Sequence, residues 1–89
     1  MEQQEAYDYI EGLCKQASPY TDKINNQWDI LTLLEVEEIE YELRVLAEEA
    51  RAIYDGLDHD NLGIILLVHE LEYALQDAED LFFEKEANQ

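Results

Sequence analysis

The chain has 89 residues, with 23 acidic against 5 basic side chains and a formal net charge of −18. This balance excludes direct binding to nucleic acid or to an anionic membrane, because both would repel such a surface, and it favours basic partners. Hydrophobic residues make up 47% of the chain. That share excludes a disordered acidic tail and predicts one folded domain over residues 1–89.

The single cysteine, Cys14, cannot form an intramolecular disulfide, which fits a reducing compartment. The longest apolar run, residues 64–68, is far shorter than the roughly 20 residues that span a bilayer. The acidic, polar start of the sequence is unlike a signal peptide. We therefore expect a cytoplasmic protein without membrane contact, located in the host cytoplasm if a phage encodes it.

A first helix is predicted over residues 3–17, where apolar residues recur at helical spacing at Ala6, Ile10, Leu13 and Ala17. Ser18-Pro19 is then expected to break the chain, with Ser18 as the cap of a second helix and Pro19 at its first position. This second helix is predicted over residues 19–31. Its Asn25-Asn26 pair makes it the weakest of the predicted elements.

The third predicted helix has the clearest signals. Thr32 and Glu35 stand three residues apart, which is the signature of a capping box. Gly56 is expected to end the helix in a left-handed conformation. Between them, apolar residues recur in steps of three and four, as in a coiled coil, at Val36, Ile39, Leu43, Leu46, Ala50, Ile53 and Leu57.

A fourth helix is predicted to begin after Asp58 or Asp60, either of which can cap it, and to run to about Glu86. Its residues 64–68 are apolar nearly all round, which predicts burial on every side or a homodimer interface that includes Ile65 and Leu66. The predicted fold is thus all-α: a compact bundle of three to four helices that contains a long antiparallel helical hairpin.

Motifs for chemistry are incomplete. Residues 58–63 resemble the start of a calcium loop, but Leu62 and His69 stand where further oxygen ligands are needed. His69-Glu70 begins like a zinc-protease motif, but Tyr73 replaces the second histidine. Cys14 lacks the context of a nucleophile. We therefore predict no enzyme activity, no cofactor and no metal.

The acids of the last two predicted helices are unusually dense. Between residues 35 and 86 only Arg44, Arg51 and Lys85 interrupt them, whereas ordinary solvated faces mix signs and gain from pairs four residues apart. Each helix would be about 36–39 Å long. The seventeen acids of the two helices, side by side over that length, average about one per 2.2 Å. Duplex DNA carries one charge per roughly 1.7 Å.

In size, charge and texture, LLEVEEIEYELRVLAEEA and LQDAEDLFFEKE are similar to the helices of small DNA-mimic inhibitors from phages and mobile elements, the antirestriction and anti-CRISPR proteins. The resemblance covers about half the chain. It implies an inhibitor that occludes the basic DNA-binding surface of a DNA- or RNA-guided nuclease complex, or of another DNA-binding protein.

The residues expected to bind such a partner are exposed acids: Glu35, Glu38, Glu42, Glu49, Glu70, Asp77, Asp80 and Glu84. The first four are expected to form one ridge opposite the apolar stripe of their helix. The alternative is a helical interaction module, such as an adaptor, antitoxin or immunity-type protein, which binds through aromatic anchors such as Trp28, Tyr41 or Tyr73. An acidic ridge free of aromatic residues favours mimicry, and an apolar patch rimmed by acids favours the module.

Overall fold

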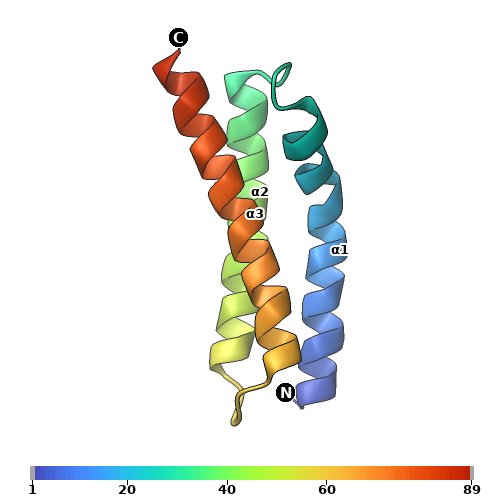
Figure 1. Ribbon diagram of the computed structural model, residues 1–89. Helices are drawn as coiled ribbons and strands as arrows, with labels where there is room; N and C mark the ends of the chain where they lie inside the picture. Colours follow the sequence, from blue (N-terminus) through green and yellow to red (C-terminus); the bar gives the residue numbers. More distant parts are fainter. Residues whose placement is uncertain (1, 89) are drawn as a thin grey trace.

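The computed structural model describes residues 2–88 and contains three α-helices within that range. Helix α1 spans Gln3–Gln27, α2 spans Leu33–Asp55 and α3 spans Leu62–Ala87. Helices α2 and α3 run side by side in opposite directions, and α1 packs against both of them (Figure 1). The all-helical fold predicted from the periodicity of the sequence is confirmed, with three helices that pack together.

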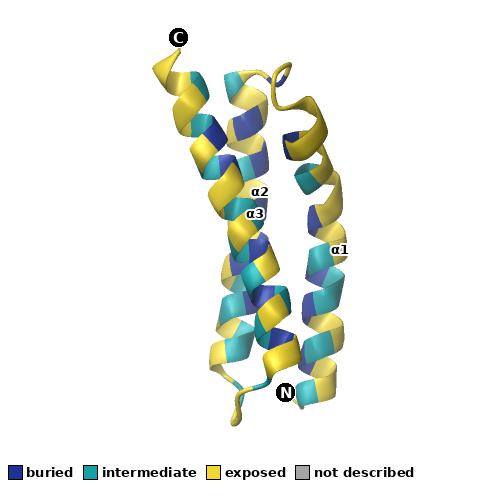
Figure 2. Cartoon of the chain, in the orientation of Figure 1, coloured by how far each residue is buried: buried dark blue, intermediate teal, exposed yellow. Residues whose placement is uncertain are grey.

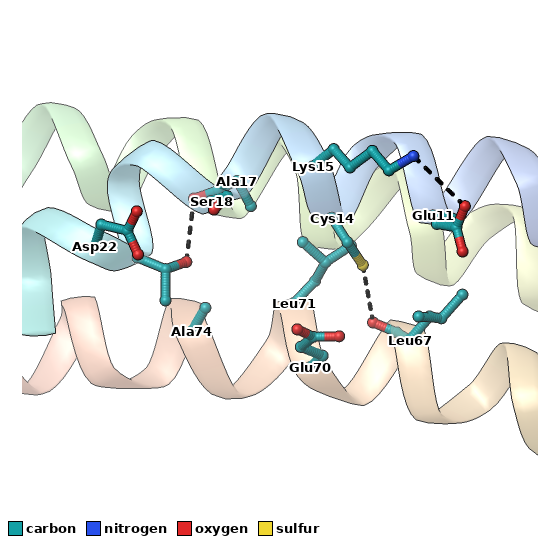
Figure 3. Close-up of a pocket in the computed structure, with 11 residues that line it drawn as sticks. Glu11, Cys14, Lys15, Ala17, Ser18, Asp22, Leu67, Glu70, Leu71 and Ala74 are labelled. Carbon is teal, nitrogen blue, oxygen red and sulfur yellow. Dashed lines mark hydrogen bonds and ion pairs between the residues drawn. The ribbon is translucent and has the colours of Figure 1, made fainter.

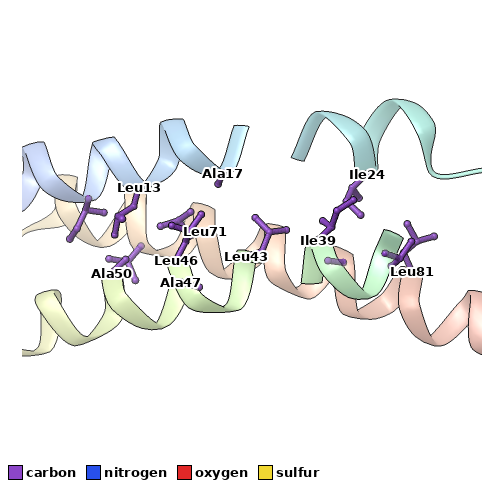
Figure 4. Packing of buried hydrophobic residues seen from close by; sticks show 14 of the residues in the cluster. Leu13, Ala17, Ile24, Ile39, Leu43, Leu46, Ala47, Ala50, Leu71 and Leu81 are labelled. Carbon is purple, nitrogen blue, oxygen red and sulfur yellow. The ribbon is translucent and has the colours of Figure 1, made fainter. Parts of the chain in front are cut away.

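One hydrophobic core extends along the bundle, and each helix contributes one row of side chains to it (Figure 4). Alanines such as Ala6, Ala47 and Ala78 take part in the core, where a small side chain lets neighbouring helices approach closely. The largest side chains with almost no exposure are Ile10, Leu43, Ile64, Leu71, Val36 and Val68. Truncating one of the leucines or isoleucines to alanine is expected to cost about 2–5 kcal/mol.

The predicted break at Ser18-Pro19 is wrong, because α1 continues through Pro19. Proline removes its own hydrogen bond to the preceding turn, and its ring crowds the carbonyl oxygen four residues earlier, a combined loss of about 3 kcal/mol. Packing outweighs this loss, since Ala17 and Ile24 on either side of Pro19 are both buried in the core. The Thr21 hydroxyl donates to the Ala17 carbonyl oxygen at 3.1 Å, a contact that favours a bend. Beyond Pro19, α1 leans toward α2 (Figure 1).

The predicted helix ends are confirmed in part. Thr32 and Glu35 form the expected capping box at the start of α2. Gly56 follows α2, but its φ of −85° and ψ of −3° are right-handed, so the left-handed conformation was wrongly predicted. The cap of α3 is Asn61, whose side-chain oxygen accepts from the Ile64 N–H at 3.2 Å, and not Asp58 or Asp60. Sequence spacing alone could not choose among Asp58, Asp60 and Asn61, all of which are residue types that cap helices.

The start of α3 is not enclosed on every side. Ile64 and Val68 are buried and Ile65 packs at the edge of the core, but Leu66 is 59% exposed and Leu62 is 74% exposed. Burial of the whole 64–68 segment within one chain is therefore a wrong prediction. With only two neighbouring helices, the bundle covers one side of α3 and leaves the other free.

The bundle is a rod. Its principal extents are 46 × 19 × 17 Å, and its radius of gyration is 14.2 Å. A compact domain of this length would have a radius of gyration of about 12 Å. The elongation follows from helices of 23 to 26 residues that lie along a common direction. It leaves most side chains with a route to solvent, as the exposed and half-buried stretches show (Figure 2).

Candidate binding surface

Seven of the eight acids predicted to bind a partner are exposed, and the eighth, Glu49, is half-buried. Glu49 accepts a hydrogen bond from the Tyr9 hydroxyl of α1, and this bond raises the pKa of Tyr9 above its ordinary value of 10.0. The row that contains Glu38, Glu42 and Glu49 therefore flanks the contact of α2 with α1. Its predicted position opposite the core is wrong.

Glu35 has a structural role at the start of α2. Its carboxylate accepts hydrogen bonds from the Thr32 N–H at 3.1 Å and from the Thr32 hydroxyl at 2.9 Å. First the backbone bond and then the hydroxyl bond stabilise the ionised carboxylate, and they lower the pKa of Glu35 below its ordinary value of 4.5. Glu35 keeps its charge, but a partner would have to compete with the cap for its oxygens.

The ion pairs of the described residues leave all eight predicted acids unpaired. Lys15 pairs with Glu11 at 3.7 Å within α1. Arg44 pairs with Glu40 within α2 and with Glu79 of α3. Arg51 pairs with Asp55 within α2 and with Glu72 of α3, so each arginine joins the two helices through one pair. The Arg51 fork donates to both oxygens of Glu72, at 3.0 and 2.7 Å, and this bonding raises the pKa of Arg51. Few cations are left to neutralise the outer faces.

Large apolar side chains lie among these acids on the outer face of α2, where the sequence predicted a ridge of acids alone. On α2, Leu34, Tyr41 and Val45 are 65%, 61% and 44% exposed. They are seven and four residues apart, so they form a second row on the outer face of the helix. Exposed residues of the same kind are Tyr9, Trp28, Ile30, Leu62, Leu66, Tyr73 and Phe83. The spacing of Leu34, Tyr41 and Val45 by seven and four residues is a sequence signal that could have predicted this row on α2.

A groove of about 490 Å³ lies between α1 and α2. Tyr20 of α1 forms one wall, and the rest comes from the outer face of α2: Leu34, Glu37, Glu38, Tyr41 and Glu42. The acids of α2 are thus not free of aromatic neighbours, and an apolar row is rimmed by carboxylates. Because an apolar patch rimmed by acids is typical of a protein-binding surface, this arrangement on α2 favours an interaction module.

A second groove, of about 440 Å³, lies between α1 and α3 and contains Cys14 (Figure 3). The Cys14 thiol lies 3.6 Å from the Leu67 carbonyl oxygen, to which it donates. Partial burial, followed by the nearby charges of Glu70 and Glu11, raises the pKa of Cys14 to about 11. A thiol that keeps its proton in this way is a poor nucleophile.

The two histidines lie in different surroundings. His59 is exposed in the link between α2 and α3, where its carbonyl oxygen accepts from the Gln3 side chain at 3.2 Å. His69 is half-buried, with its ring 6.0 Å from that of Tyr73. Among residues 2–88, no three His, Cys, Asp or Glu side chains are arranged to hold a metal ion. None of the three helices has the length and apolarity required to cross a membrane.

Comparison of the chain with protein-family models, with curated proteins and with solved structures gave no match. The charge, shape and exposed side chains of the bundle therefore have to indicate its function.

Proposed function

We propose that the protein binds the basic surface with which another protein holds DNA or RNA, and that it blocks this surface as a DNA mimic of the anti-CRISPR or antirestriction type. The observation that carries the proposal is the charge of the rod. Its 18 net negative charges over 46 Å average about one per 2.6 Å. Duplex DNA carries one per roughly 1.7 Å. A groove lined with Lys and Arg would attract both duplex DNA and this protein. The unpaired carboxylates would then bind the Lys and Arg side chains that otherwise hold phosphates.

The second candidate is an interaction module for a protein partner, and the exposed row of Leu34, Tyr41 and Val45 favours it. The two functions differ in their response to salt. Mimicry draws its affinity from many charge pairs, and it weakens steeply as salt rises. A module with aromatic anchors loses affinity when one anchor is removed, and salt affects it little.

A panel of purified RNA-guided nuclease and restriction complexes tests the proposal through their binding of duplex DNA. Mimicry predicts that the protein competes with DNA on at least one complex, and that this competition fades between 50 and 300 mM salt. Inhibition that is independent of salt would favour the module, and failure to compete on every member of the panel would contradict mimicry.

A charge variant makes this test specific. Glu38→Gln, Glu42→Gln, Asp77→Asn and Glu84→Gln remove four exposed acids that form no hydrogen bond or ion pair within residues 2–88. The matched control removes four exposed acids of α1 and its following turn: Glu5→Gln, Asp8→Asn, Asp22→Asn and Asp29→Asn. Both variants carry the same net charge. Mimicry through α2 and α3 predicts that only the first variant loses inhibition.

We also propose that two copies associate through the start of α3, with Leu66 and the edge of Ile65 at their contact. Residues 61–69 contain no acid, so this part of a strongly acidic chain can meet its copy without direct repulsion between carboxylates. Exposed Leu62 and Leu66 provide the apolar surface for that contact.

A further inference from the structure

The outer face of α2 has a row of apolar side chains with carboxylates on both sides. Leu34, Tyr41 and Val45 stand at positions that repeat after seven and four residues, and all are at least 44% exposed. On the side toward α1 lie Glu38 and Glu42, which line the groove with Tyr20. Helical geometry places Glu37 and Glu48 on the other side of the row. Both are exposed.

We propose that this face of α2, together with the α1–α2 groove, is the docking site for a basic amphipathic helix of the partner protein. The inference rests on the proposed function, since it requires a basic partner, and it identifies where that partner is anchored. The row from Leu34 to Val45 extends about 16 Å along α2, at roughly 1.5 Å per residue. Three turns of a second helix would cover it, with apolar residues on the row and Lys or Arg on both flanks.

Charge complementarity selects this occupant. A second copy of the chain would place Glu37, Glu38 and Glu42 against the same residues, and like charges in contact oppose such pairing. A basic helix turns the same carboxylates into partners. The long side chains of Lys and Arg can also lie along Leu34 with their apolar stems and reach the acids with their charged ends.

Tyr41 is expected to be the centre of the site. Its ring is 61% exposed and lies with Glu37, Glu38 and Glu42 around the groove. A guanidinium group stacked on an aromatic face gains a cation–π interaction while its N–H groups donate to nearby carboxylates. The corresponding row on α3, Leu62, Leu66 and Tyr73, begins in the acid-free segment 61–69 and lacks such flanking charges over its first turns.

The site can be tested with the full chain and two synthetic peptides of the same composition. One is an 18-residue helix with Leu on one face and Arg on both flanks, and the other has the same residues in scrambled order. We expect the amphipathic peptide to bind at least tenfold more tightly. Amide chemical shifts should change along α2 around Leu34, Tyr41 and Val45 and at Tyr20. Equal affinity of the two peptides, or shifts spread over all acidic faces, would overturn the inference.

Variants at two exposed tyrosines sharpen the test. Tyr41→Ala is expected to lower the affinity for the amphipathic peptide at least tenfold. Tyr41→Phe should retain most of this affinity, and Tyr73→Ala should change it less than twofold. Tyr41 and Tyr73 are 61% and 68% exposed, so none of these changes removes a core contact. A larger loss from Tyr73→Ala than from Tyr41→Ala would overturn the inference.

The result can be separated from that of the proposed function. If the protein competes with DNA on a nuclease complex, but Tyr41→Ala competes as well as the unmodified chain, then mimicry stands and the docking site is wrong. If the amphipathic peptide binds at Tyr41, but no complex in the panel is inhibited, then the site stands and mimicry is wrong.

Discussion

Thr32 and Glu35 close the first turn of α2 through reciprocal hydrogen bonds, and this pair has a defined pH dependence. The lowered pKa of Glu35 means that its stabilising effect is fully present above about pH 4.5 and is lost as the pH falls through its value in the folded protein. Glu35→Ala should therefore lower the free energy of unfolding at pH 7 more than at pH 3. Urea denaturation at both pH values measures the difference, with Glu38→Ala as the control for helix propensity. An equal effect at both pH values would contradict a role for the ionised cap.

Cys14 provides a second prediction for a single residue. Its pKa of about 11 lies two units above the ordinary value of 9.0. At pH 8 the folded protein should thus contain about 100-fold less thiolate than the unfolded chain. The rate of reaction with iodoacetamide, measured with and without urea, should differ by about this factor. Equal rates would mean that the α1–α3 groove does not protect the thiol.

At the scale of single helices, a substitution in α1 is expected to raise the stability of the protein. Gly12 lies inside this helix, and a Cβ added there would meet no atom within 4 Å apart from its chain neighbours and the backbone of its own helix. Gly12→Ala is therefore expected to stabilise the protein by about 0.5–1 kcal/mol. Gly63→Ala is the matched control, because its Cβ would lie 3.3 Å from the Asn61 oxygen that caps α3. Thermal unfolding of both variants checks this, and an equal gain at Gly63 would contradict the role of the cap.

Helices and core rows are the part of this protein that its sequence predicts well. Thr32, Glu35 and the row from Val36 to Ala50 all stand where spacing and capping chemistry placed them. Pro19 was misread because its local preference opposes a helix, while the burial of Ile24 favours one, and only the packed structure shows which effect is larger. The relation of Glu49 to Tyr9 joins residues 40 positions apart, so no local pattern could reveal it. Seven of the eight acids expected at the surface are exposed, but the apolar row beside those of α2 was not predicted, although Tyr41 was expected as an aromatic anchor of the alternative function.

At the scale of the whole molecule, net charge opposes folding. Repulsion among the unpaired acids is stronger in the folded rod than in an expanded chain, and salt screens it. We expect the melting temperature to rise when NaCl is increased from 10 to 300 mM. The variant that removes Glu38, Glu42, Asp77 and Glu84 should show a smaller rise. A melting temperature that falls with salt would show that the ion pairs of Arg44 and Arg51 contribute more than the repulsion.

The proposed dimer is also a property of the whole molecule. Leu66→Glu places a charge in the acid-free segment without removing a buried side chain, since Leu66 is 59% exposed. Sedimentation at high micromolar concentration should show dimers of the unmodified chain and monomers of this variant. Circular dichroism should report the same helix content for both. Monomers of the unmodified chain would refute the dimer.

Three helices are an odd number, and this gives the rod a polarity. Helices α1 and α3 point toward one end and α2 toward the other (Figure 1), so their macrodipoles cannot cancel in pairs. The carboxyl ends of α1 and α3 lie toward one end of the rod, and that of α2 lies toward the other (Figure 1). The helix dipoles therefore leave more partial negative charge at the end where α1 and α3 finish. The two strands of a DNA duplex run in opposite directions, so its backbone offers the same charge from either end. A groove that accepts DNA equally in both directions would therefore distinguish the two orientations of this protein through its helix dipoles.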